Sequence, residues 1–548
     1  MILAYNIPFF SIFIPLLCGI VCLVLKPKAS KLLTLLMLTV ECVLLTILAV
    51  QMSVSGESFR FAMGHFPAPF GNELRAGALE ALMACSFGAV TLFSLLGGMR
   101  DIENDVPQSK RSLLNVIICI LFTALMVMAF TNDMFTSFVF IDIITISACS
   151  LVMIKPGGRT LIATIRYLIM SLVGSALYLL SLSMLYNISG HLLMEPIGAA
   201  LQSVTAGGQY SMPLFIIAAA MVTALSIKSA VFPFHSWLPD AHASATTTAS
   251  AVLSGIIIKS YLFLMIKIFY RVFGVELVKL LQISNILLLF GVLGLIIGSV
   301  QAIRQRDIKR MLSYSSVAQI GYICIAIGLG SEAGMVAACF HIIAHALSKA
   351  MLFTAAGGLA AVSGGSKDFD AIRGSGRRNK TAGIAFTCGA LSMVGIPLFS
   401  GFISKLYLAT AAADTMFAGV VIFTAVVLST VLSSMYYFPA IACIFSKRPE
   451  GAMDKAINAP EATGTLVTAG TIKVGDTIET VKAREATETP NMLEAPKMAR
   501  TIKTTKESAN PDGMFIVSCI AFIILNLALG IFSQPVLSAI STGLSVLG

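Results

Sequence analysis

Seven titratable side chains lie inside apolar stretches of this chain and could carry protons. They are Asp142, Lys228, Lys259, His341, His345, Lys349 and Lys405. A lysine at the centre of a membrane helix costs roughly 2.5–3.5 kcal/mol on insertion scales, so a chain that keeps several is expected to use them. Buried lysine and histidine can exchange protons near neutral pH. We therefore expect a relay that moves protons, in order, from Asp142 and Lys228 to Lys405.

The first part of this relay surrounds an interrupted apolar run. Lys228 ends the run, and Pro233 interrupts it five residues later. A polar link follows, with His235, Trp237, Asp240 and His242, before a second apolar stretch that carries Lys259. Asp142 lies in another apolar stretch, VFIDIITISACSLV, where an unpaired carboxylate would be costly. We expect Lys228 to be its partner.

His341, His345 and Lys349 recur at intervals of four residues. This spacing places them on one face of a helix. A single buried histidine is usually an ordinary core residue, but three titratable groups in one stripe indicate a hydrated path. We also expect Glu80 at an outer mouth of the protein and Glu41 in contact with a neighbouring subunit.

Two helix breaks position these groups. Proline lacks a backbone donor, so Pro233 and Pro397 should each open a helical turn, and Gly395 and Gly401 loosen the second site further. Lys405 follows the second break. Paired discontinuous helices are typical of transporters that bind ions near the bilayer midplane. The alternative is that these are ordinary proline kinks with lysines that reach from helix ends to the membrane surface.

The composition requires a membrane protein. Of 548 residues, 57% are hydrophobic and 12% charged, whereas soluble domains carry about a quarter charged residues. The net charge of +10 resides largely in short links, where it indicates topology rather than nucleic-acid binding. The eleven cysteines form no CxxC pair, so we expect no iron–sulfur or zinc framework and no bound cofactor.

About 14 apolar stretches approach the ~20 residues that a bilayer requires. Basic residues concentrate in the odd-numbered links, with exceptions at the second, seventh and eighth. The positive-inside rule then predicts that the odd links are cytoplasmic and that both termini lie outside. We expect a multi-pass protein of the cell inner (cytoplasmic) membrane.

The expected organisation has five parts. They are an N-terminal three-helix region (1–110), a first repeat (111–273), a second repeat (274–446), a polar cytoplasmic insertion (447–512) and a C-terminal transmembrane helix (513–548). The insertion is rich in Thr, Ala, Glu and Lys and contains a possible short hairpin from Thr465 to Val481. It is either a mobile linker or a partner-binding surface.

Four motifs carry a family resemblance. They are FPFHSWLPDAHASATTTASAVLSGIIIK, RDIKRMLSYSSVAQIGY, HIIAHALSKAMLF and GIPLFSGFISK. They resemble motifs of the proton-conducting, antiporter-like membrane subunits of respiratory complex I, of Mrp-type sodium/proton antiporters and of membrane-bound hydrogenases. The resemblance implies an all-α fold of about 14 transmembrane helices with two inverted five-helix repeats, in which the seventh and twelfth helices are discontinuous.

The resemblance also implies roles for the seven residues. Asp142 and Lys228 would form the ion pair of the first half, and Lys259 would bridge. His345 would link the halves, with His341 and Lys349 nearby. Lys405 would be the terminal site of the second half.

The chain departs from the family pattern in three places. The family usually has glutamate at the position of Asp142, so the pair with Lys228 should be looser or water-bridged. Threonines replace prolines at 246–248, and the insertion at 447–512 is not part of the pattern. Some members of the family have glutamate where this chain has Lys405. The lysine therefore favours a subunit of the Mrp, hydrogenase or distal complex I type.

The function we expect is proton translocation, with sodium exchange as a possible addition, by one subunit of a multisubunit complex. The chain has no redox or hydrolytic motif, so chemistry would reside in partner subunits of a complex I-like, hydrogenase or Mrp assembly. The alternative is a standalone secondary sodium/proton antiporter. A purely structural scaffold is disfavoured because five buried charged positions would cost on the order of 10 kcal/mol before pairing.

Overall fold

The computed structural model describes residues 2–63, 66, 72–206, 211–413, 416–447 and 512–547. Twelve helices in these ranges are long and apolar enough to cross a membrane. Two shorter apolar helices, Met212–Lys228 and Lys380–Val394, occupy the remaining two predicted spans. The predicted all-α polytopic fold is therefore confirmed.

The N-terminal region contains the three predicted spans. It also contains a small hairpin that the sequence did not predict. Its elements are α1 (Ile2–Val24), α2 (Pro27–Ser55), β1 (Phe59–Ala62), β2 (Glu73–Ala76), α3 (Ala78–Gly97) and α4 (Met99–Asp105). The strands pair antiparallel, with Phe59 opposite Ala76. Pro27 stands in the first turn of α2, where its missing N–H costs no helical hydrogen bond.

The next elements form the first group of five spans. They are η2 (Gln108–Lys110), α5 (Arg111–Phe130), α6 (Met134–Met153), α7 (Gly158–Ser189), α8 (Met194–Ala206), α9 (Ser211–Lys228), η3 (Phe234–Ser236), α10 (Trp237–Ser244), α11 (Thr247–Val252), η4 (Leu253–Ile257), α12 (Ile258–Ile268) and η5 (Phe269–Phe273). The segments η4 and η5 are π-helical, so α11 to η5 together make one span, the eighth.

The second group of five spans and the C-terminal helices follow. They are α13 (Val275–Leu280), α14 (Ile283–Ile303), α15 (Ile308–Gly328), α16 (Glu332–Ala361), α17 (Phe369–Ile372), α18 (Ser375–Arg378), α19 (Lys380–Val394), α20 (Ser400–Ala412), α21 (Met416–Phe445), α23 (Gly513–Ile531) and α24 (Ser533–Leu547). The sequence predicted one helix after residue 513, but α24 is a separate helix that packs on α3 and α16.

Both predicted helix breaks are present. The seventh span divides into α9, which ends at Lys228, and α10, which begins at Trp237. The twelfth divides into α19, which ends at Val394, and α20, which begins at Ser400. Each break falls in the fourth span of its group. Because five is odd, two successive groups of five spans cross the bilayer in opposite directions, as inverted repeats require.

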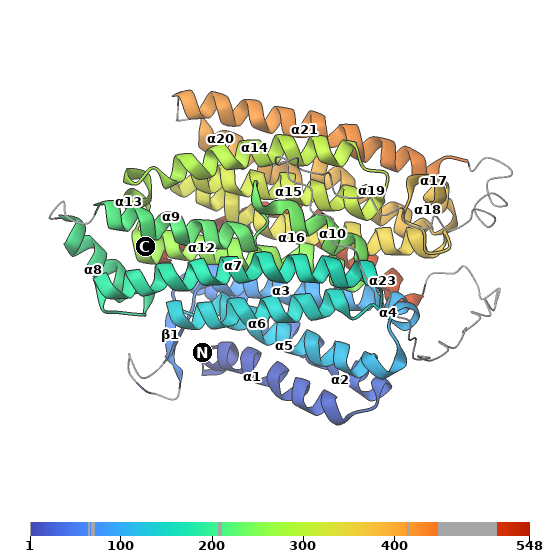
Figure 1. Ribbon diagram of the computed structural model, residues 1–548, viewed down its shortest axis with the longest axis horizontal. Coiled ribbons are helices and arrows are strands. Elements are labelled where there is room, and N and C mark those ends of the chain that lie inside the picture. Colours follow the sequence, from blue (N-terminus) through green and yellow to red (C-terminus); the bar gives the residue numbers. More distant parts are fainter. Residues whose placement is uncertain are drawn as a thin grey trace, which may run out of the picture. The chain divides into compact units, whose positions relative to one another are not determined.

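Two spans form the centre of the helical assembly. The eighth span, Thr247–Phe273, and α16 are fully buried over their most apolar windows, whereas α1, α2, α7 and α14 are about two-fifths buried. Figure 1 shows α16 lying among α15, α10 and α12, and α16 also packs on α19, α20 and α23. The central helices carry Lys259, His341, His345 and Lys349, so the fold itself encloses the predicted relay.

The polar insertion is not part of this description. Apart from Lys447 and Asp512, residues 447–512 lie outside the described ranges. The predicted hairpin from Thr465 to Val481, and the choice between a linker and a partner-binding surface, therefore stay predictions.

Candidate functional site

The first half of the site is an ion pair between two helices. Lys228 Nζ, at the end of α9, lies 3.4 Å from Asp142 Oδ1 on α6. The same ammonium donates to Thr145 Oγ1 at 2.8 Å, and Ser175 Oγ on α7 donates to the Asp142 carboxylate. Charge-assisted hydrogen bonds are normally about 2.7–2.9 Å long, so this pair is direct but loose. The side chain of Lys228 is 2% exposed, whereas that of Asp142 is 35% exposed.

A pair of hydroxyl groups leads from this ion pair toward the eighth span. Thr145, which holds Lys228, also lies 3.5 Å from the hydroxyl of Tyr261 on α12. Tyr261 is two residues from Lys259. Thr145 was not predicted as a site residue, although it lies one helical turn from Asp142 and so shares its face.

Lys259 lies at the centre of the assembly and is fully buried. Its Nζ donates to the carbonyl oxygen of Ser254, five residues earlier in the same helix. Ser254 belongs to the π-helical segment Leu253–Ile257, and π-helical turns are frequent at functional sites. The segments η4 and α12, which hold Lys259, pack on α16, the helix that carries the stripe.

The stripe on α16 forms as its spacing predicts. The rings of His341 and His345 stack with centroids 5.6 Å apart. His341 Nδ1 lies 2.8 Å from Ser404 Oγ on α20, and Lys349 Nζ donates to Leu312 O at 2.9 Å. Neither ring nitrogen of His345 has a hydrogen-bond partner among the described residues. A neutral imidazole has one N–H donor and one acceptor nitrogen, so His345 has both groups available for hydrogen bonding.

Lys405 completes the line in the second half. Its Nζ donates to Val394 O, the last residue of α19, at 2.8 Å and to Thr430 Oγ1 on α21 at 3.0 Å. A cation at a helix C-terminus is stabilised by the exposed carbonyl groups there. The stripe reaches the same helix through His341, because its partner Ser404 precedes Lys405 in α20. The contacts join Asp142 to Lys228 and His341 to His345, whereas Lys259 and Lys405 lie on helices that pack on α16.

Two secondary expectations are wrong. Glu80 does not lie at an outer mouth, because its Oε1 pairs with Arg271 Nη2 at 2.5 Å and both side chains are buried. This pair ties α3 to the end of the eighth span. Glu41 does not reach a neighbouring subunit, because it is fully buried, and its oxygens have no partner within the described ranges. Sequence alone could not tell which face of α2 points inward.

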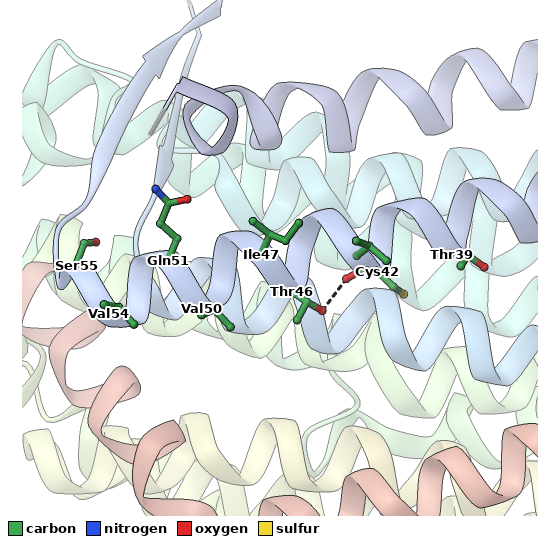
Figure 2. Close-up of a pocket in the computed structure, with 9 residues that line it drawn as sticks. Thr39, Cys42, Thr46, Ile47, Val50, Gln51, Val54 and Ser55 are labelled. Carbon is green, nitrogen blue, oxygen red and sulfur yellow. Dashed lines mark hydrogen bonds between the residues drawn. The ribbon is translucent and has the colours of Figure 1, made fainter.

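A groove of about 820 Å³ runs along α2, away from the relay. Figure 2 shows its lining side chains on one face of the helix, with the Thr46 hydroxyl donating to the carbonyl of Cys42 at 2.7 Å. The lining contains Ile47 and three valines but no charged residue. This face suits contact with lipid or another apolar helix and offers nothing to hold an ion.

Comparisons with known proteins agree with this geometry. Residues 131–433 match the family described as NADH:quinone oxidoreductase/Mrp antiporter, TM. NADH-quinone oxidoreductase subunit N of Desulforudis audaxviator is 33% identical over 403 residues, which are 72% of this chain and 77% of that protein.

Two solved structures share the fold. A chain of the Mrp complex from Dietzia sp. aligns with a TM-score of 0.78 at 20% identity, covering 100% of this chain and 98% of that one. A chain of the membrane-bound sulfane sulfur reductase, an archaeal respiratory complex, aligns with a TM-score of 0.77 at 22% identity, covering 99% and 98%. The chain belongs to the NADH:quinone oxidoreductase/Mrp antiporter transmembrane family.

Proposed function

We propose that this protein is the proton-translocating subunit of a multisubunit membrane complex. The observation that carries the proposal is the set of titratable groups, from Asp142 and Lys228 to Lys405, on packed helices inside the two groups of spans. The hydroxyl groups of Thr145 and Tyr261 extend from Lys228 to the eighth span, and Ser404 on α20 contacts His341. Protons can pass along such a line through short-lived water chains, while the apolar helices around it exclude other ions.

Each group has a definite task in this mechanism. The Lys228 ammonium is stabilised by Asp142 and Thr145, so loosening that pair releases a proton toward Lys259. Lys349 lies in the same stripe as the two imidazoles, and His345 offers its ring nitrogens to carry the proton from Lys259 to the stripe. Lys405 receives it at the end of α19. Repulsion among neighbouring cations keeps the lysines from all being protonated together, so protonation at one end favours release at the other.

The exposed side of Asp142 supports a multisubunit complex. A carboxylate that is 35% exposed in the middle of a membrane helix would face lipid in an isolated chain, at a cost of several kcal/mol. A neighbouring subunit that covers α6 with polar groups would remove this cost. The relatives named above are parts of NADH-quinone oxidoreductase, Mrp and sulfur-reducing respiratory complexes, and we expect partners of the same kind here. The expected topology has the odd links in the cytoplasm and both termini outside.

The decisive experiment is native purification in mild detergent, followed by mass spectrometry and reconstitution into vesicles. Proton uptake is followed with a pH-sensitive dye for the wild type and for Lys228→Ala. We expect a stable stoichiometric complex, and loss of about 100-fold in proton movement in the variant. Unchanged proton transport by an assembled Lys228→Ala complex would contradict the proposed relay.

The same preparation separates the alternatives. Co-purified iron–sulfur or nickel–iron subunits would make this chain the pump module of a redox enzyme. Small membrane subunits alone would place it in an Mrp-type antiporter. Full sodium/proton exchange by the chain reconstituted by itself would favour a standalone antiporter instead.

A further inference from the structure

The second helix break is held by α23, a span that contains none of the seven titratable residues. α23 packs on α16, α19 and α20. Asn526 and Gly530 lie four residues apart in it and so share one face of the helix. An added Cβ at Gly530 would overlap the carbonyl oxygen of Leu398, so the backbone of α23 touches the segment between α19 and α20. Leu398 has a φ of +80°, a conformation that a residue with a side chain keeps only when its surroundings hold it.

Asn526 joins this break to the helix that carries the imidazole stripe. Its side chain is fully buried. Its Nδ2 donates to Ser348 Oγ on α16 at 2.6 Å. Its Oδ1 accepts from Ser400, the first residue of α20, both the hydroxyl at 3.2 Å and the backbone N–H at 3.4 Å. One amide group therefore connects the first turn of α20 to α16, at the residue that precedes Lys349.

Ser392 completes the network from the last turn of α19. Its hydroxyl lies 3.0 Å from that of Ser348 and 3.4 Å from that of Ser400. It also accepts from the backbone N–H of Gly401 at 3.3 Å. An added Cβ at Gly401 would overlap the carbonyl oxygen of Ser392, so the two helix ends are in direct contact. These contacts hold both sides of the break, α19 and α20, against α16.

The contacts of Lys405 depend on this arrangement. Lys405 lies five residues after Ser400 in α20, and its Nζ reaches back across the break to Val394 O at 2.8 Å. Its other partner is the hydroxyl of Thr430. Both partners are neutral, and a hydrogen bond weakens steeply when its length or angle departs from the optimum. The position of α20 relative to α19 therefore decides whether the ammonium meets its carbonyl.

We propose that Asn526 is a positioning residue for Lys405. It holds α20 against α16 and α19, so that the ammonium of Lys405 lies at the carbonyl of Val394. This inference rests on the proposed function and gives the C-terminal span a part in it. It also links the second break to the stripe, because Ser348, which accepts from the amide, adjoins Lys349.

A purely structural role is the competing explanation, because a buried amide can simply fasten helices together. Hydrogen bonds between membrane helices contribute little stability on average. An apolar side chain could also pack in the same place without a polar group to satisfy. The three hydrogen bonds of Asn526 described above all go to the helices that carry Lys349 and Lys405. This convergence favours positioning over general fastening.

The test uses the purified complex in vesicles and measures both proton uptake and amide hydrogen exchange by mass spectrometry. Asn526→Leu keeps a similar side-chain volume but removes the amide. We expect proton uptake to fall about tenfold and exchange of the amides at 395–401 to rise about tenfold, because the start of α20 opens more often. Exchange at 229–237, around the first break, should not change.

Three results for an assembled Asn526→Leu complex would overturn the proposal. The first is unchanged exchange at 395–401. The second is an equal rise in exchange at both breaks, which would indicate general loosening of the protein. The third is faster exchange at 395–401 with proton uptake within twofold of the wild type, because the position of the break would then not matter for transport.

Ser518→Ala is the matched control on the same helix. Ser518 is also fully buried in α23, but its hydroxyl donates to Phe93 O on α3 at 2.6 Å, away from the break. We expect proton uptake within twofold of the wild type and unchanged exchange at 395–401. Effects equal to those of Asn526→Leu would mean that any anchor of α23 serves equally, and the specific role of Asn526 would be wrong.

A double variant tests whether Asn526 acts through Lys405. Adding Asn526→Leu to Lys405→Met should not lower proton uptake further, because the group that the amide positions is already absent. A further tenfold loss would contradict the proposal. If Asn526→Leu does not assemble, Ser348→Ala decides, since it removes only the acceptor of the amide. We expect about threefold lower uptake with faster exchange at 395–401, and no change in either would overturn the proposal.

Lys228→Ala separates this proposal from the function on which it rests. Transport retained in Lys228→Ala would overturn the proton-translocating function, whereas exchange at 395–401 would still show whether Asn526 holds the break. Transport lost in Lys228→Ala but retained in Asn526→Leu would overturn only the positioning role.

Discussion

The two broken helices hold their lysines by different means. In the first half, Lys228 contacts a carboxylate, Asp142, and a hydroxyl, Thr145. In the second half, Lys405 contacts a backbone carbonyl at the end of α19 and the hydroxyl of Thr430. A full opposite charge stabilises an ammonium more strongly than the partial charge of a helix end. We therefore expect Lys228 to hold its proton more tightly than Lys405 does.

The largest expected effect comes from removing the second lysine. Lys405→Met keeps the length of the side chain but leaves the line without its terminal proton acceptor. We expect proton uptake by vesicles containing the complex to fall by about 100-fold. Lys405→Arg is the control, because arginine preserves the charge at Val394 O but does not release its proton. If Lys405→Arg transports protons normally, Lys405 acts only as a fixed charge. The proposed difference between Lys228 and Lys405 would then be wrong.

Removing the carboxylate tests the other half of the contrast. Asp142→Asn retains a hydrogen-bond acceptor for Ser175 but removes the charge opposite Lys228. We expect a loss of about tenfold in transport, equivalent to about 1.4 kcal/mol. The matched variant is Thr430→Val, which removes a neutral partner of Lys405 and should cost much less. Equal losses in the two variants would mean that charge does not distinguish the sites.

The backbone beside the two lysines should differ in its tolerance of a methyl group. Gly395, which ends α19, has a φ of +92°, and an added Cβ would lie 2.8 Å from Lys405 Cδ. We expect Gly395→Ala to lower the stability of the complex by about 1–2 kcal/mol, measured by thermal unfolding. Gly174→Ala is the counterpart in the first half, where the Cβ would lie 3.4 Å from Lys228 Cε. A larger loss at Gly174 would contradict this difference.

The smallest effect is expected outside both halves. Glu41 is buried in α2 without a hydrogen-bond partner in the described ranges. Glu41→Gln should leave transport within about twofold of the wild type, because a neutral amide replaces a carboxyl that pairs with nothing on the relay. The same vesicle assay measures it. A large loss of proton transport in Glu41→Gln would show that the relay extends into the N-terminal helices. It would contradict the expectation that only the two halves carry protons.

The sequence by itself determined the spans, the two breaks and the seven titratable residues. Apolar runs near the bilayer thickness define spans without reference to any contact, and Pro233 and Pro397 act on the turns in which they stand. The stripe of His341, His345 and Lys349 follows from helical periodicity alone. The pairing of Asp142 with Lys228 was also predictable, since a carboxylate in a membrane span is costly without a cation.

Only the tertiary structure decided how these residues connect. Thr145, Tyr261, Ser404 and Thr430 join the line through contacts between residues far apart in the chain, and a hydroxyl in an apolar stretch has no sequence signal that names its partner. The inward face of α2, which buries Glu41, and the pair of Glu80 with Arg271 depend on helix rotation.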